Sequence, residues 1–120
     1  MSAALYDLEI EQGSTFSIDI TYQNDSVTVD LNGYSARLHI REDYSGTLID
    51  SLTSSGSDSE IVLGNGTTPI TPPNIRITIP ASETAKYTFD EAVYDLEIEH
   101  FAVVTKLLRG TIKLIKEVTL

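Results

Sequence analysis

The feature that most constrains this chain is a strict alternation of apolar and acidic residues near its C-terminal end. Over positions 94–99 the sequence reads Tyr-Asp-Leu-Glu-Ile-Glu, and the same six letters occur at positions 6–11. Successive side chains of an extended chain point to opposite faces, so the Tyr, Leu and Ile would line one face and the acids the other. The pattern predicts strands with one face in a core and one face in water.

Similar alternation recurs along the chain, separated by turn signals such as Gln12-Gly13 and Asn32-Gly33. The expected extended segments are 5–11, 14–22, 27–31, 34–41, 47–52, 60–63, 74–79, 93–99 and 103–119. Only 81–87 has helical character, over one or two turns. About eight short strands with one helical turn predict an all-β, antiparallel β-sandwich, Ig-like or jelly-roll-like, with a small closed barrel as the second choice. A length of 120 residues predicts a single domain over 1–120.

Charged residues fall into rows on the predicted strands. The outward positions of 34–41 are Ser35, Arg37, His39 and Arg41, and the last segment carries Lys106, Arg109, Lys113 and Lys116. Opposite charges on neighbouring strands attract, so we expect the row of 34–41 to lie across from an acidic row, and the bases of the last segment to lie beside Asp95, Glu97 and Glu99. Gly110 is expected to mark a bulge in the last strand.

The charge balance excludes some partners. With 8 Lys and Arg against 18 Asp and Glu, the net charge of −10 argues against nucleic acid and against anionic membrane surfaces. No apolar run approaches the ~20 residues needed to cross a bilayer, and the N-terminus does not resemble a signal peptide, so we expect a product made in the cytoplasm without membrane insertion. The absence of cysteine excludes disulfides, thiolate metal sites and a cysteine nucleophile.

No motif predicts catalysis, a metal site or a cofactor. The alternating carboxylates are typical of an exposed sheet face, the two histidines have no ligand spacing, and no nucleophile elbow or phosphate loop is present. Tyr44 and Tyr87 could stack on a sugar, although packing in the core or at its rim is the alternative for both. The long polar segment 53–74 is the expected place for specific contacts, because long loops in small domains are often functional.

A series of blocks resembles a known group of proteins. The blocks are Gly-Ser-Thr-Phe at 13–16, Val-Asp-Leu-Asn-Gly-Tyr-Ser-Ala-Arg-Leu-His-Ile-Arg at 29–41, the strand 75–79 with the turn 82–85, Val-Tyr-Asp-Leu-Glu at 93–97, Leu-Leu-Arg-Gly at 107–110 and Glu-Val-Thr at 117–119. In this order they resemble small β-sandwich structural proteins of tailed bacteriophages. The resemblance implies a non-catalytic virion component of the tail, baseplate or fibre attachment, made in the bacterial host cytoplasm.

Such a protein would dock onto neighbouring virion subunits within a ring or another oligomer. The expected interface residues are Asp7, Glu9, Glu11, Arg37, His39, Arg41 and Asn65. Two alternatives are a carbohydrate-binding module for host surface glycans, with Tyr44 or Tyr87 as the stacking platform, and a capsid decoration protein.

Overall fold

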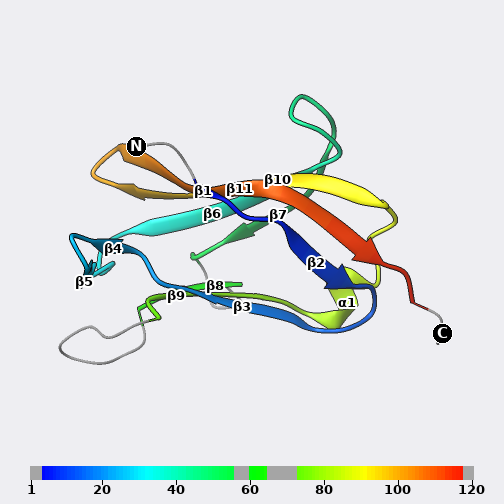
Figure 1. Ribbon diagram of the computed structural model, residues 1–120, viewed down its shortest axis with the longest axis horizontal. Helices are drawn as coiled ribbons and strands as arrows, with labels where there is room; N and C mark the ends of the chain where they lie inside the picture. Colours follow the sequence, from blue (N-terminus) through cyan, green and yellow to red (C-terminus); the bar gives the residue numbers. More distant parts are fainter. Residues whose placement is uncertain (1–3, 56–59, 65–72, 118–120) are drawn as a thin grey trace.

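The computed structural model describes residues 4–55, 60–64 and 73–117 (Figure 1). Its elements are β1 (Ala4–Leu5), β2 (Leu8–Glu11), β3 (Phe16–Ile20), β4 (Gln23–Asn24), β5 (Val27–Thr28), β6 (Ser35–Arg41), β7 (Leu48–Thr53), β8 (Ile61–Leu63), β9 (Ile75–Ile79), the short helix α1 (Ala81–Thr84), β10 (Glu91–His100) and β11 (Val103–Ile115). Within these ranges no helix is both long and apolar enough to cross a membrane.

The strands form two facing sheets, so the predicted all-β sandwich with one helical turn is confirmed. The large sheet has the order β1-β11-β10-β6-β7, with β2 also paired to β11, and the small sheet has the order β3-β9-β8. In Figure 1 the large sheet lies above the small one, and a separate β4–β5 hairpin lies at one end. The sheet is not wholly antiparallel as expected, because β1 and β2 both run parallel to β11.

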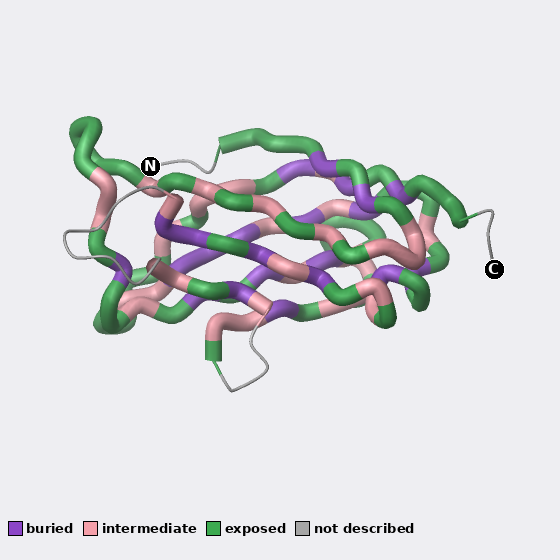
Figure 2. Tube along the Cα trace, turned by 90° about the horizontal axis from the view of Figure 1, so that it is seen from below, coloured by how far each residue is buried: buried purple, intermediate pink, exposed green. Residues whose placement is uncertain are grey.

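The core lies between the sheets and consists of the residues that alternation predicted. Isoleucines of β9 face aliphatic side chains of β6, β10 and β11, and the fully buried set includes Ile10, Ile40, Leu52, Ile61, Ile75, Leu96, Ile98 and Ile112. Figure 2 shows buried and exposed positions alternating along the strands. This burial removes apolar surface from water at about 25 cal/mol per Å², which is the main source of stability.

Two expectations need correction: the strand 5–11 is interrupted, and Gly110 is not at a bulge. β1 ends at Leu5 and β2 begins at Leu8, so regular pairing is interrupted at Tyr6 and Asp7, although both strands pair with β11 in the same register. Gly110 does not mark the bulge: the register shift lies opposite Leu96 and Glu97 of β10, where Leu107 of β11 is the extra residue. A Cβ on Gly110 would lie 2.2 Å from the Tyr6 carbonyl oxygen, so glycine is needed there because another backbone passes close by.

Candidate functional site

The outer face of the large sheet carries three charged rows. Strand β10 lies between β6 and β11, so its acids have bases on both sides. Asp95 is opposite His39 and Arg109, and Glu97 is opposite Arg37 and Lys106. The prediction that bases of the last segment lie beside the acids of 93–99 is confirmed for Lys106 and Arg109, and the row of 34–41 lies across from the same acids.

Glu97 differs from the expectation that it faces water. Its carboxylate accepts hydrogen bonds from Arg37 Nε and Lys106 Nζ, and the residue is only 8% exposed. Arg37 also lies 3.6 Å from Glu99, and Lys106 lies 3.5 Å from Asp95. Burial acts to raise the pKa of Glu97, but the hydrogen bonds from Lys106 and Arg37 outweigh it and hold that pKa below its ordinary value.

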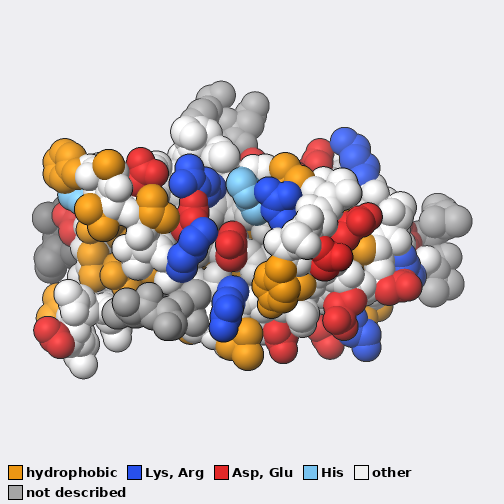
Figure 3. All heavy atoms as spheres, turned by 90° about the horizontal axis from the view of Figure 1, so that it is seen from above, with side chains coloured by type: hydrophobic (Ala, Val, Ile, Leu, Met, Phe, Trp, Pro, Cys, Tyr) orange, Lys and Arg blue, Asp and Glu red, His pale blue; other side chains and the backbone are white. Residues whose placement is uncertain are grey.

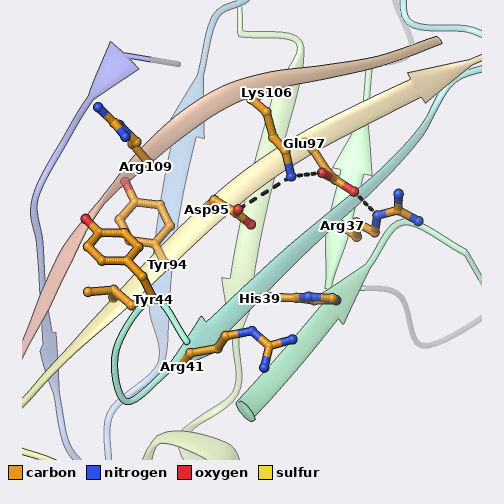
Figure 4. Close-up of a pocket in the computed structure, with 10 residues that line it drawn as sticks. Arg37, His39, Arg41, Tyr44, Tyr94, Asp95, Glu97, Lys106 and Arg109 are labelled. Carbon is orange, nitrogen blue, oxygen red and sulfur yellow. Dashed lines mark hydrogen bonds and ion pairs between the residues drawn. The ribbon is translucent and has the colours of Figure 1, made fainter. Parts of the chain in front are cut away.

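Beside this cluster the face is hollowed. We call the hollow, of about 720 Å³, the cationic groove, and define it by Arg37, His39, Arg41, Tyr44, Lys106 and Arg109. Figure 4 shows that these side chains come from β6, β11 and the β6–β7 loop, with Asp95 and Glu97 of β10 between them. The volume is in the range of sites that bind small molecules or peptide segments.

Tyr44 lies at the edge of the groove and is 71% exposed. Its loop is closed by hydrogen bonds from Glu42 N to Thr47 O (3.0 Å) and from Gly46 N to Asp43 O (3.1 Å). Arg41 Nη1 donates to Gly46 O at 3.2 Å, which attaches the loop to the groove. The loop that carries the exposed ring is therefore held against the groove.

A second surface lies at the end of the β10–β11 hairpin. We call it the hairpin end and define it by Phe101, Ala102, Val103 and Val104. All four are exposed, with Phe101 at 88% and Val103 at 66%. Figure 3, which looks down on the large sheet, shows hydrophobic side chains gathered at the left, where this hairpin lies, and basic side chains nearer the centre.

The structure places the remaining expected site residues apart from the groove. Asp7, Glu9 and Glu11 are exposed beside β11, and Asp7 Oδ1 accepts a hydrogen bond from Thr111 N at 3.0 Å. Asn65 lies outside the described residues. Of the expected basic row, Arg37, His39 and Arg41 all line the groove.

Tyr87, expected as a possible stacking platform, is in the core and 4% exposed. Its hydroxyl donates to Asp50 Oδ2 at 2.6 Å. Burial and this acidic partner raise the pKa of Tyr87 well above its ordinary value, so the ring is a neutral packing residue. Its face is not presented to a ligand, whereas that of Tyr44 is.

The side chains of the groove are of types that bind charged and apolar groups. In the described ranges no three His, Asp or Glu side chains gather as metal ligands would. The groove offers guanidinium and ammonium donors, which bind oxyanions, and an aromatic ring, which packs on apolar groups. Sequence reasoning named part of this set, but it missed Lys106 and Arg109 as groove residues because their distance from Arg41 depends on strand order.

No family model matches the chain, and no curated protein matches it in sequence. It is similar in structure to extracellular domains of the voltage-gated sodium channel beta4 subunit, described as parallel homodimers, at 10% identity and a TM-score of 0.48 over 98% of this chain and 97% of that one. It is also similar to a chain from work on multimeric cell-adhesive interactions of these beta subunits, at 10% identity and a TM-score of 0.51 over 92% of each chain. The second likeness supports an Ig-like sandwich, and at such low identity it extends to the fold alone.

The expectation of a phage virion protein is therefore wrong, and so are the expected tail, baseplate or capsid role, the virion location and the virion partners. The solved structure that matches with a TM-score of 0.51 comes from work on cell-adhesive sodium channel beta subunits, not on virion proteins. The blocks behind the resemblance, such as 29–41 and 93–97, form β6 and β10, whose alternation any Ig-like sandwich requires.

Proposed function

We propose that the chain forms one non-catalytic, Ig-like domain that associates with a second copy of itself through the hairpin end. The observation that carries this proposal is the exposure of Phe101 on a strained turn. The beta subunits that share the fold make multimeric cell-adhesive interactions, and self-association here would be of that kind.

Apolar side chains are exposed on both faces of the hairpin end. Val103 and Val104 are neighbours in a strand and point to opposite faces, yet they are 66% and 45% exposed. Folding therefore leaves their apolar surface in contact with water. Contiguous exposed apolar side chains on a soluble protein are typical of sites that contact another protein.

The turn itself costs stability. Phe101 and Ala102 form the two-residue connection between β10 and β11 with φ values of 50° and 65°. Asn and Gly are the residues that favour such a turn, and other residues lose about 1–2 kcal/mol each in the left-handed region. Apart from the contact of its ring with His100, at 4.2 Å between centroids, Phe101 is free to contact a partner. Since Phe101 is 88% exposed, most of its apolar surface remains available for binding.

The distribution of charge favours contact between two copies at the uncharged hairpin end. Two copies of a chain with a net charge of −10 repel each other over most of their surface. Residues 101–105 carry no charge, so two hairpin ends can approach without desolvating an ion. Burying Phe101 and the two valines on each side would then favour a symmetric dimer.

Sedimentation equilibrium of the wild-type chain and of the double variant Phe101→Asn, Ala102→Gly tests the proposal. We expect the wild type to dimerise with rising concentration and the variant to stay monomeric. Because Asn and Gly relieve the strained turn, the free energy of unfolding of the variant should increase by about 1 kcal/mol. Its melting temperature should rise accordingly. If the variant is more stable than the wild type but no longer associates, then Phe101 and Ala102 act in binding and not in folding.

Tyr44→Asn is the matched control, since it removes an exposed aromatic ring from another surface. It should dimerise as the wild type does. A wild type that stays monomeric, or a double variant that dimerises normally, would overturn the proposal.

A further inference from the structure

We propose that the cationic groove binds an acidic segment of a partner protein, with at least two carboxylates and apolar side chains between them. This site is separate from the hairpin end and does not depend on the function proposed above. Folding leaves some bases of the groove without an acidic partner.

Four of the chain's eight Lys and Arg residues line the groove, together with only two of its 18 acids. Lys106 and Arg37 are used internally by Glu97. Arg41 and Arg109 make no ion pair with any described residue, although acids outnumber bases more than twofold in the sequence. Two unpaired arginines on one hollow therefore give it an excess of positive charge on an otherwise acidic protein.

The geometry indicates more than one anionic group in the ligand. In Figure 4 the side chains of Arg41 and Arg109 extend away from each other, and Tyr44 lies between the points at which they leave the backbone. Two carboxylates on one extended segment could each contact one guanidinium group in this arrangement. Val93 and the Tyr44 ring supply an apolar surface between them.

The groove is also preformed in the absence of a ligand. Arg41 is hydrogen-bonded to the loop that carries Tyr44, and the Glu97 cluster fixes Arg37 and Lys106. Side chains that are already ordered lose less entropy on binding. A densely charged polyanion such as nucleic acid is disfavoured by the net charge of −10, while an acidic peptide carries fewer charges and offers planar carboxylates that match guanidinium groups.

Fluorescence anisotropy with a labelled peptide of alternating glutamate and leucine tests this site, and the same peptide with glutamine in place of glutamate is its control. We expect the glutamate peptide to bind the full chain and the glutamine peptide not to bind. Arg41→Gln and Arg109→Gln should each weaken binding about fivefold, the effect of an exposed ion pair of about 1 kcal/mol. Tyr44→Ala should weaken it further by removing the apolar contact.

Arg76→Gln is the matched control, because Arg76 is an exposed arginine on the small sheet, paired with Asp19 at 2.7 Å. It should leave peptide binding unchanged, as should Phe101→Asn, Ala102→Gly, so that failure of one proposal is separate from failure of the other. Equal binding of both peptides, or full binding by the double variant Arg41→Gln, Arg109→Gln, would sink the inference. Tighter, arginine-dependent binding of a sulfated polysaccharide would also reject the peptide as the ligand.

Discussion

At the scale of single residues, Glu97 shows that neighbouring strands can bury a residue on the expected solvent face of an alternating strand. The sequence places it on the water face between Leu96 and Ile98, yet Arg37 and Lys106 close over it from both neighbouring strands. It is the buried acid of the described core. A buried carboxylate is tolerated only when charged donors satisfy it, so these three residues act as one unit.

The pH dependence of stability tests this unit. A folded-state pKa below the ordinary 4.5 means that Glu97 stabilises the fold above about pH 4.5 and loses this contribution as the pH falls through its folded pKa. Glu97→Gln should therefore flatten the acid side of the curve of unfolding free energy against pH, measured by urea denaturation. At neutral pH the variant should lose about 2 kcal/mol, the value of hydrogen bonds to a charged group.

Glu9→Gln is the control for this experiment, because Glu9 is exposed and makes no ion pair among the described residues. It should leave the acid slope as in the wild type. An unchanged slope in Glu97→Gln would show that the cluster does not couple proton binding to folding.

At the scale of elements, a buried asparagine holds the β4–β5 hairpin to the small sheet. Asn74 is 0% exposed. Its Nδ2 donates to the Tyr22 and Val29 carbonyl oxygens at 3.0 and 2.8 Å, and its Oδ1 accepts from Tyr22 N at 2.8 Å. One side chain thus satisfies the backbone on both sides of a hairpin whose strands have only two residues each.

Asn74→Ala should leave Tyr22 N and Val29 O without these partners and cost about 2–3 kcal/mol. Hydrogen exchange should show early loss of protection at the Val29 amide, which donates to Tyr22 O at 3.0 Å. Asn24→Ala, at the exposed tip of the same hairpin, should change neither result. Wild-type protection at Val29 in Asn74→Ala would mean that the hairpin is held by other contacts.

At the scale of the whole molecule, the two proposed sites respond to salt in opposite directions. The hairpin end is uncharged and brings together two copies that repel each other, while the cationic groove attracts an anion. Screening lengths shorten from about 10 Å at 0.1 M salt to about 3 Å at 1 M. Added salt therefore weakens both the repulsion and the attraction.

We expect dimerisation to tighten and acidic-peptide binding to weaken as sodium chloride rises from about 0.05 to about 0.5 M, over which the screening length shrinks severalfold. Sedimentation and anisotropy on the same samples would measure both. Dimerisation that weakens with salt would indicate an ionic interface and would contradict the assignment to the hairpin end.

The sequence by itself determined the sandwich and the inward face of most strands, because a side-chain period of two is a local property of extended chain; it did not show the interruption of 5–11 or the strand β4. It also predicted opposite charges on neighbouring rows. The tertiary structure alone decided that β10 lies between β6 and β11, that Tyr87 is buried while Tyr44 is exposed, and that Tyr6 passes over Gly110. These outcomes depend on contacts between residues far apart in the chain, which no local pattern records, and they place Arg41 and Arg109 on one hollow.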